Sequence, residues 1–403
     1  MVQKIFVESY GCTLSKSETG LYVNKMLNDG GILVDSPDEA DISVIGTCVV
    51  IKHTEEKMLK RIGELSEHSK VKVMGCLPPV SAGTLKDERI DIIDPKEFRK
   101  FYSGSLDDIE IKEPSIFEGI PINQGCTGSC NFCISHIARG KLVSRNPQKI
   151  VNQIRMQLER GIREVRITSL DTAAYGKDMG TNLARLVAQI SQINDDFKLR
   201  IGMMEPRNTH DIMGELLSSY DDEKVFKFMH IPVQSGSNRI LSLMNREYLR
   251  EEFEGIVKTF REKFRDSVIS TDIIAGYHGD DEESFNETMD LLEKSRPDIV
   301  NITRFSPRPF TKDFSEKTPS SEKIKSWTQA YTNKHKEIIE SNMERHIGKE
   351  KQIMITEKGK EGTSVGRDNA YRPVVVSGDI GIYTKVHCEI VDMGNTYLIG
   401  KII

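Results

Sequence analysis

The first quarter of the chain alternates short apolar runs with longer amphipathic segments. The runs KIFVESYGC, ADISVIGTC and VKVMGC are rich in β-branched residues, and helix-like segments cover roughly Ser15–Asn28 and Thr54–Glu67. This alternation predicts a doubly wound parallel α/β domain, which we expect to cover residues 1–112. Each run ends in a cysteine: Cys12, Cys48 and Cys76. Because the carboxyl ends of parallel strands share one edge of a sheet, we expect these thiols to converge there.

The middle of the chain repeats a strand–helix unit at intervals of roughly 30 to 40 residues. The expected strands are FEGIPINQG, REVRITSL, KLRIGMM, KVFKFMHIPV, SVISTDIIAG and DIVNITRF. Helical patterns lie between them, for example Pro147–Arg160 and Glu251–Phe264. Six such units predict a partial (β/α)6 barrel over residues 113–342, open on one side.

Residues 343–403 read as short strands separated by Gly, Asp and Asn turns, a pattern typical of a small β-barrel. Cations and an aromatic residue lie in and around these turns, and we take them as candidate RNA contacts: Lys358, Lys360, Arg367, Tyr371 and Arg372. Such residues suit phosphate contacts and base stacking, although an ordinary solvated surface would have the same composition.

Composition narrows the class of protein. The 403 residues are 37% hydrophobic and 29% charged, which is typical of a globular chain with more than one domain. No apolar run approaches the ~18 residues of a membrane span, and MVQKIFVESYG is a strand pattern rather than a signal peptide. Seven cysteines are too few for a disulfide scaffold, so we expect a cytoplasmic enzyme. The net charge of −5 excludes a uniformly basic nucleic-acid binder, so any RNA contact must be local.

The run QGCTGSCNFC contains the strongest chemical motif. Cys126, Cys130 and Cys133 can ligate three irons of a cubane cluster and leave the fourth iron open. Structural zinc is the alternative, but it prefers four N or S ligands. The spacing, with Phe132 before the last cysteine, resembles the signature of radical S-adenosylmethionine enzymes, in which the open iron binds S-adenosylmethionine.

The three strand-end cysteines form a second candidate site. If Cys12, Cys48 and Cys76 converge, they make another three-thiolate set with another open iron. The alternative is that they are small core residues, as we expect for Cys388 in a late strand.

Polar residues follow the strands of the central domain. We expect them at the mouth of the barrel, where they could hold the amino, carboxylate, ribose and sulfonium groups of S-adenosylmethionine. These candidates are Asp171, Glu205, Gln234, Ser235, Ser237 and Arg246. Structural roles are the alternatives: Asp171 could cap the next segment, Ser237 could be a helix N-cap, and Arg246 a surface cation.

The order of these parts resembles the radical S-adenosylmethionine methylthiotransferases over nearly the whole chain. Several passages are similar to the archaeal and eukaryotic branch that acts on N6-threonylcarbamoyladenosine in tRNA. These passages are INQGCTGSCNFC, HIARG at His136–Gly140, TSLDTAAYGKDMGTNL, HIPVQSGSN and MNREY. The last segment looks like a TRAM domain. Two departures from the family pattern are Gly46, where Asn is frequent, and Pro78–Pro79 after Cys76.

The resemblance implies two [4Fe-4S] clusters and S-adenosylmethionine as cofactors. It implies conversion of N6-threonylcarbamoyladenosine at position 37 of tRNA to its 2-methylthio derivative, with sulfur carried by the cluster on Cys12, Cys48 and Cys76. The implied partners are the anticodon loop of tRNA and a reductase or a flavodoxin- or ferredoxin-type electron donor; we expect a monomer. Isopentenyladenosine in tRNA or an aspartate of a ribosomal protein remain alternative substrates, and an RNA-binding iron–sulfur sensor is an alternative from another class.

Overall fold

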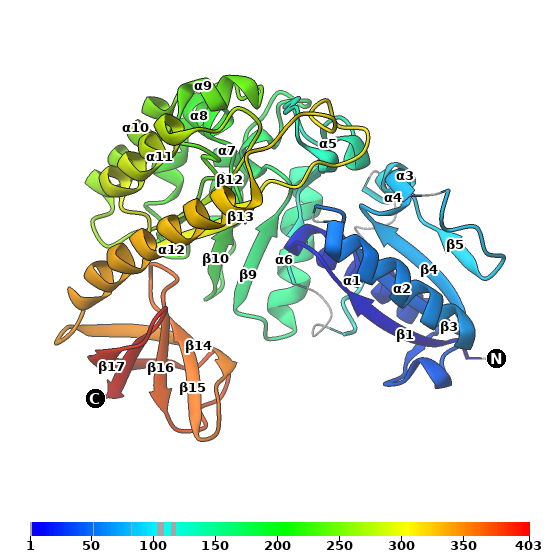
Figure 1. Ribbon diagram of the computed structural model, residues 1–403. Coiled ribbons are helices and arrows are strands. Elements are labelled where there is room, and N and C mark those ends of the chain that lie inside the picture. The colour runs from blue at the N-terminus through cyan, green and yellow to red at the C-terminus, as the bar shows by residue number, and fades with distance from the viewer. Residues whose placement is uncertain (1, 51, 82, 103–108, 114–117) are drawn as a thin grey trace. The chain divides into compact units, whose positions relative to one another are not determined.

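The computed structural model describes residues 2–50, 52–81, 83–102, 109–113 and 118–403 (Figure 1). The chain forms two compact units. Unit 1 comprises Met1–Arg160, Arg166–Asn182 and Ser306–Glu316, and unit 2 comprises Gly161–Val165, Leu183–Phe305 and Lys317–Ile403. These units do not coincide with the division at residues 112 and 342, which stays a prediction.

Unit 1 begins with a five-stranded parallel sheet in the order β2-β1-β3-β4-β5. The strands are β1 (Lys4–Ser9), β2 (Ile32–Leu33), β3 (Ile42–Thr47), β4 (Lys70–Gly75) and β5 (Ile90–Ile92). The strand order reverses between β1 and β3, and ligands of open α/β sheets bind beyond the carboxyl ends of strands at such a point.

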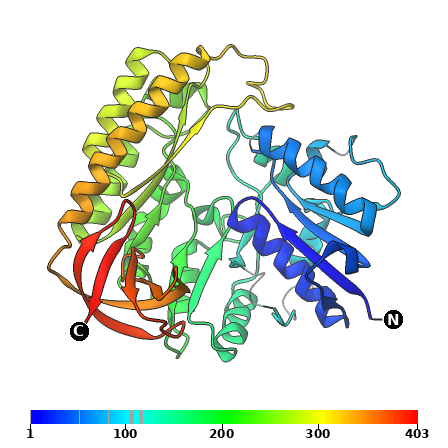
Figure 2. The same cartoon turned by 60° about the horizontal axis from the view of Figure 1, so that its bottom comes forward.

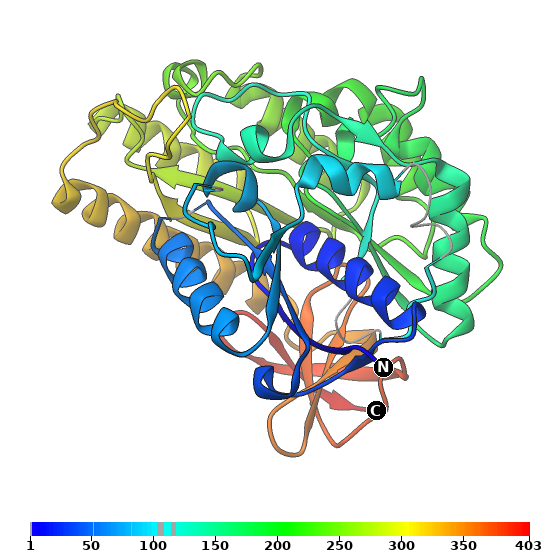
Figure 3. The ribbon, with the colours of Figure 1, turned by 90° about the vertical axis from the view of Figure 1, so that its right-hand side faces the viewer.

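Helices cover both faces of this sheet, which confirms the doubly wound prediction. One core contains residues of α1 (Thr13–Asn28) and α4 (Pro95–Tyr102). The other core contains residues of α2 (Lys52–His68) and α3 (Pro78–Ser81). Alternate residues of β1, β3 and β4 enter the two cores, as period-2 geometry requires. Figure 3 shows α1 and α2 on either side of the blue strands.

The rest of unit 1 surrounds the CxxxCxxC loop. β6 (Ile120–Pro121) pairs in parallel with the end of β9 (Glu164–Thr168). β7 (Asn123–Gln124) pairs with β8 (Val143–Ser144), and the loop with α5 (Ile134–Arg139) lies between these two strands. The expected helix at Pro147–Arg160 is α6 (Pro147–Glu159), which has Pro at its start and an Asn146 side-chain cap.

Unit 2 contains the remaining strands of the central repeat. They are β10 (Lys198–Ile201), β11 (Phe228–His230), β12 (Val268–Ala275) and β13 (Ile299–Arg304), and β11, β12 and β13 form a parallel sheet. The helices are α7 (Leu183–Ser191), α8 (Pro206–Ser219), α9 (Asn238–Leu243), α10 (Arg250–Lys263), α11 (Glu282–Ser295) and α12 (Ser321–Glu344). All six expected strands are therefore present, as β6 and β9 to β13.

The C-terminal segment of unit 2 is a closed five-stranded barrel in the order β14-β15-β16-β18-β17 (Figure 2). Its strands are β14 (Glu350–Lys358), β15 (Thr363–Arg367), β16 (Pro373–Ser377), β17 (Lys385–Met393) and β18 (Leu398–Ile402). Cys388 is fully buried in its core, as predicted. In the described parts of the chain, every helix is too short or too polar to cross a bilayer.

Candidate metal centres and active site

The three N-terminal cysteines follow strands whose ends are in register. Gly46 of β3 pairs with Ser9 of β1 and with Met74 of β4, and Thr47 pairs with Gly75. Cys48 and Cys76 therefore leave the sheet as neighbours, and Cys12 leaves from the strand on the other side of β3. The structure thus brings the three cysteines to one edge of the sheet, where the sequence predicted them.

Thr47 and two glycines shape the turns that carry these thiols. The Thr47 carbonyl accepts from the Cys76 amide at 3.2 Å, and its hydroxyl accepts from Leu77 N at 3.2 Å. A Cβ on Gly75, which has φ +96°, would lie 2.4 Å from the Thr47 oxygen. A Cβ on Gly11, with φ +97°, would lie 3.0 Å from the Cβ of Cys48. Only glycine permits these backbone angles and approaches without strain.

Cys12, Cys48 and Cys76 form an all-sulfur donor set, the kind that iron–sulfur clusters take. Desolvation raises the pKa of Cys12 to about 11 and also raises the pKa of Cys48, and the charge of Cys76 adds to both shifts, so the three groups interact electrostatically. Among the residues that the structure describes, no three His, Cys, Asp or Glu side chains surround a point where one metal ion could sit. Thiolates of a cubane bind different irons and stand around a volume instead, which suits an all-sulfur set.

The CxxxCxxC loop is held in a compact turn. The Gly128 amide donates to Cys126 Sγ at 3.2 Å, and the Cys133 amide donates to the Cys130 carbonyl at 3.2 Å. Cys133 occupies the N-cap position of α5. A Cβ on Gly128 would lie 3.6 Å from Cys126 Sγ and 3.8 Å from Cys130 Sγ, within the space between two thiols. The turn thus holds the Cys126 and Cys130 thiols around one small space, with Cys133 at the start of the next helix.

Asp171 lies near this loop within unit 1. Desolvation raises the pKa of the Cys126 thiol to about 12, and the charges of Asp171 and of the other two loop cysteines act in the same direction. The Asp171 carboxylate accepts from the Ala173 amide at 3.0 Å and caps the 3-10 helix η4 (Thr172–Ala174). Asp171 therefore has the capping role that the sequence left open, and a cofactor contact there stays a prediction.

The other cofactor candidates lie in unit 2, after β10 and β11. Glu205 caps α8, with its carboxylate accepting from the Asn208 amide at 3.0 Å. Gln234 has φ +71°, an uncommon backbone for a non-glycine residue, and pairs with β12 through Asp272 O and Ile274 N. The Met204 amide donates to the His230 carbonyl, which brings the ends of β10 and β11 together.

The serines and the arginine gather around the same turn. The Ser235 hydroxyl accepts from the Ser237 amide at 3.2 Å. Ser237 is at the N-cap position of α9 but makes no cap bond; its hydroxyl is buried without a partner in the described structure. Arg246 donates from Nη2 to Pro232 O at 3.3 Å and lies over the Tyr248 ring, so it is not a free surface cation. An orphan hydroxyl at this turn is consistent with a ligand contact.

A polar group inside the strands was missed by sequence reasoning. Asp272 of β12 accepts from the Asn301 amide at 2.7 Å and contacts His230 Nε2 at 3.1 Å. Desolvation opposes ionisation, but the hydrogen bonds and the His230 charge outweigh it and hold the pKa of Asp272 below its usual value. An acidic residue inside β12, whose run VISTDIIA is mostly apolar, was the available signal.

Two further residues were missed, Arg139 and Glu18. Both are buried, and they form an ion pair beside Cys76 in unit 1. Arg139 stands in the HIARG passage, but nothing in its sequence neighbourhood identifies a partner 121 positions away.

The RNA candidates of the C-terminal barrel fall into two groups. Lys358 and Lys360 are exposed. Arg367 pairs with Glu357 at 2.6 Å and lies over the Tyr371 ring, whose hydroxyl donates to Glu164 at 2.9 Å. Arg372 is 5% exposed and donates to the Ser267 carbonyl at 3.0 Å. The exposed lysines are thus the members of the set whose charged groups are open to solvent.

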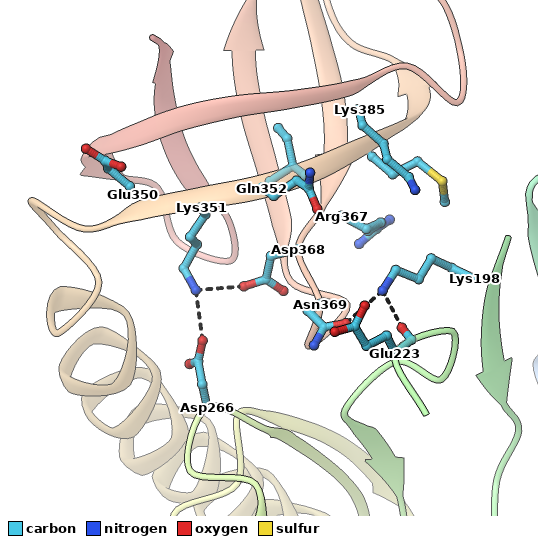
Figure 4. Close-up of a pocket in the computed structure, with 12 residues that line it drawn as sticks. Lys198, Glu223, Asp266, Glu350, Lys351, Gln352, Arg367, Asp368, Asn369 and Lys385 are labelled. Carbon is cyan, nitrogen blue, oxygen red and sulfur yellow. Dashed lines mark hydrogen bonds and ion pairs between the residues drawn. The ribbon is translucent and has the colours of Figure 1, made fainter. Parts of the chain in front are cut away.

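A cavity of about 360 Å³ lies beside β14 in unit 2 (Figure 4). Its lining carries as many acids as cations, and Lys351 contacts Asp266 at 2.9 Å and Asp368 at 3.0 Å. Lys198 donates to the Asn369 side chain at 2.9 Å. Because the charges of its own residues balance, this cavity is a poor site for a phosphate group.

Comparison with known proteins agrees with this geometry. The family models described as "Radical SAM superfamily", "Uncharacterized protein family UPF0004" and "TRAM domain" match residues 120–292, 4–93 and 344–403. The fold also resembles a solved structure of TsrM, a radical S-adenosylmethionine methyltransferase from Kitasatospora setae. The TM-score is 0.57 at 11% identity, over 78% of this chain and 77% of that one.

Full-length relatives define the family more narrowly. A Pyrococcus abyssi protein named "Probable threonylcarbamoyladenosine tRNA methylthiotransferase" is 35% identical over 99% of both chains. A Thermotoga petrophila "tRNA-2-methylthio-N(6)-dimethylallyladenosine synthase" is 29% identical over 99% of this chain and 97% of its own. With both three-cysteine sets in place, the chain belongs to the radical S-adenosylmethionine methylthiotransferases, in the family of the archaeal threonylcarbamoyladenosine tRNA enzymes.

Proposed function

We propose that this enzyme converts N6-threonylcarbamoyladenosine at position 37 of tRNA to its 2-methylthio derivative. The observation that carries the proposal is the presence of two three-cysteine sets within one unit, in a chain similar over its whole length to the archaeal enzymes. Sulfur insertion at an unactivated aromatic carbon needs both a radical source and a sulfur source, and two sets can serve the two needs.

Cys126, Cys130 and Cys133 would hold the cluster at which S-adenosylmethionine binds. With both bound, the chemistry they would supply is the removal of the hydrogen from C2 of the adenine. The loop contributes the three thiolates and the Gly128 space between them. Contacts to S-adenosylmethionine are proposed for Asp171, Glu205, Gln234, Ser235, Ser237 and Arg246. Among these, the unpartnered Ser237 hydroxyl supports the proposal most directly.

Cys12, Cys48 and Cys76 would hold a second [4Fe-4S] cluster, which supplies the sulfur. The in-register strand ends support this assignment because they place all three thiols at one sheet edge without further rearrangement.

We further propose a cytoplasmic monomer that takes electrons from a reductase or a flavodoxin- or ferredoxin-type donor. The anticodon loop of tRNA would be its partner, and exposed Lys358 and Lys360 support a backbone contact from the C-terminal barrel. Arg367, Tyr371 and Arg372 remain candidates for the same surface, although each has a protein partner here.

The test is an anaerobic turnover assay. The reconstituted protein is mixed with S-adenosylmethionine, a strong reductant and tRNA that carries threonylcarbamoyladenosine, and digested nucleosides are analysed by mass spectrometry. We expect the 2-methylthio derivative to form. If 5′-deoxyadenosine forms without a modified nucleoside, the radical chemistry stands and the tRNA assignment is wrong. Isopentenyladenosine tRNA is the second substrate to test, because the Thermotoga relative is named for that reaction.

A further inference from the structure

Arg139 is a fully buried cation beside the N-terminal cysteines. It is the last residue of α5, in the segment that follows the CxxxCxxC loop, and its side chain is 0% exposed. Glu18 of α1, itself 2% exposed, pairs with Arg139 Nη1. A buried ion pair is costly to desolvate and is weak evidence for a stabilising role, so its location calls for another explanation.

Neighbouring polar groups fix this pair in place. The Gln124 side chain donates to Glu18 Oε1 at 3.0 Å, and Arg99 Nε donates to Gln124 Oε1 at 2.8 Å. Arg99 also donates to the Arg139 carbonyl. The guanidinium of Arg139 is therefore held both through its counter-ion and through its own backbone.

The guanidinium presents one edge to the cysteines. Its Nε donates to Cys76 Sγ at 3.3 Å. Nη2 is buried and has no hydrogen-bond partner in the described structure. In a planar guanidinium, Nε–H and one N–H of Nη2 point the same way from the same edge, as in bidentate pairs with carboxylates. The free N–H thus points alongside Cys76 Sγ.

The position of the free N–H indicates what it could bind. A buried donor left unpaired is energetically costly, so this N–H calls for an acceptor. The acceptor must lie beside the Cys76 thiol. An iron–sulfur cluster ligated by Cys76 would place inorganic sulfur there.

We propose that Arg139 is a positioning residue for the second cluster, donating from Nε to the Cys76 thiolate and from Nη2 to a sulfur of that cluster. This inference rests on the proposed function, in which Cys12, Cys48 and Cys76 hold the sulfur-supplying cluster. A fixed cation with two N–H donors stabilises the more negative, reduced form of a cluster. Arg139 therefore raises the reduction potential of the second cluster and links it to the segment that follows the CxxxCxxC loop.

The experiment isolates the second cluster in the full chain. Cys126, Cys130 and Cys133 are replaced by Ala, so that all bound iron belongs to the other set. The reduced cluster is then titrated anaerobically and read by electron paramagnetic resonance. Glu18→Gln with Arg139→Gln removes both buried charges together and so avoids an unpaired Glu18. At the midpoint potential of the parent protein, we expect the ratio of reduced to oxidised cluster to be about tenfold lower in this double variant. For one electron, this corresponds to a reduction potential that is lower by about 59 mV.

Two further variants sharpen the result. Arg139→Lys keeps the charge opposite Glu18 but loses the two-donor edge, so its potential should also fall, by less. Glu8→Gln with Arg61→Gln removes another Glu–Arg pair of the same unit, joined at 2.5 Å, and should leave the potential unchanged. This control separates a cluster contact from general loss of an ion pair.

The outcomes are distinct. A cluster that loads in every variant with an unchanged potential overturns the role of Arg139 and leaves the proposed function intact. If the double variant takes up no iron, the Arg139→Lys protein decides, and an unchanged potential there overturns the inference. If the parent protein with Arg139 intact binds no iron, the second cluster itself is refuted and the inference fails with it.

Discussion

The surroundings of each thiol determine the free energy needed to deprotonate it, and a thiol must lose its proton before it can bind a metal. Desolvation raises the pKa of Cys12 to about 11, with a further contribution from Cys76, and also raises the pKa of Cys48. Because only the thiolate binds iron, loading these sites must release protons that the empty protein retains at neutral pH. The positive charge of Arg139 opposes these shifts, but desolvation outweighs it and both pKa values stay raised.

Replacing one cysteine of each set should separate the two functions. Cys130→Ala should abolish reductive cleavage of S-adenosylmethionine, because two thiolates are too few for the cofactor-binding cluster. Cys48→Ala should retain part of this cleavage and lose sulfur insertion. Chromatography of 5′-deoxyadenosine and mass spectrometry of the nucleosides measure the two activities. Methylthio product from the Cys48→Ala enzyme would refute the role of the second set.

Lys227 provides a test of pH dependence. Desolvation lowers the pKa of its ammonium to about 8, while an unfolded lysine titrates near 10.4. Between these values the unfolded state binds more protons, so the native state gains stability as pH rises through this interval. Relative to Lys227→Met, the wild-type protein should therefore gain stability from pH 8 to pH 10, by less than about 1.4 kcal/mol per pH unit. Paired thermal melts would show it, and parallel pH profiles would contradict the burial effect.

At the scale of elements, strand ends position the chemistry. β3 and β4 end in register at Thr47 and Gly75, and the next residue of each chain segment is a proposed ligand. Polar turns at the ends of β10 and β11 carry the cofactor candidates of unit 2 in the same way. A strand is a rigid support, so a change at its last residue displaces the ligand that follows.

Gly75→Ala should disrupt the second set through the backbone. The added Cβ would meet Thr47 O at 2.4 Å, and alanine at φ +96° adds strain of about 1–3 kcal/mol. We expect lower stability and loss of iron from the Cys12, Cys48 and Cys76 set. Gly63→Ala, in α2 with open space around it, should instead stabilise by about 0.5–1 kcal/mol. Iron content and chemical denaturation measure both effects, and normal iron uptake by Gly75→Ala would contradict the argument.

Arg372 shows how a single side chain secures the C-terminal barrel within unit 2. It contacts Asp266 at 3.0 Å and Asp368 at 3.2 Å and donates to two backbone carbonyls. Arg372→Ala should cost about 3 kcal/mol, because it leaves buried partners unsatisfied. Lys360→Ala, at an exposed position, should cost less than about 0.5 kcal/mol. Equal melting temperatures for the two variants would contradict a structural role for Arg372.

At the scale of the whole molecule, net charge limits how tRNA can bind. The chain carries −5, so its average field does not attract RNA and a local contact must do so. Lys358 and Lys360 are exposed on the C-terminal barrel, whereas the cavity beside β14 is neutralised internally.

Salt dependence measures this contact. If Lys358 and Lys360 each contact a phosphate, replacing both by Ala should weaken tRNA binding and reduce the slope of log K against log salt by about 1.4. Lys60→Ala with Lys258→Ala changes the net charge equally at exposed helix positions and should leave the slope unchanged. Equal slopes for the two double variants would mean that the barrel lysines make no phosphate contact.

Local spacing made much of this protein predictable. The CxxxCxxC set, the six strand–helix units and the strand-end positions of Cys12, Cys48 and Cys76 follow from periodicity and connectivity, which act over a few residues at a time. The parallel sheet then brings distant strand ends together by a general rule, so even that convergence could be predicted.

Tertiary packing alone decided the partners of the buried charges. Arg139 meets Cys76 across 63 positions, and Arg372 meets the Ser267 carbonyl across 105. The residues around an arginine in the sequence look the same whether its side chain contacts solvent, RNA or a thiol. A single charged residue creates no periodic pattern that would tell these cases apart. The sequence by itself therefore determined which chemistry the chain can carry, and the fold decided which cations are free to bind RNA and which one faces the cysteines.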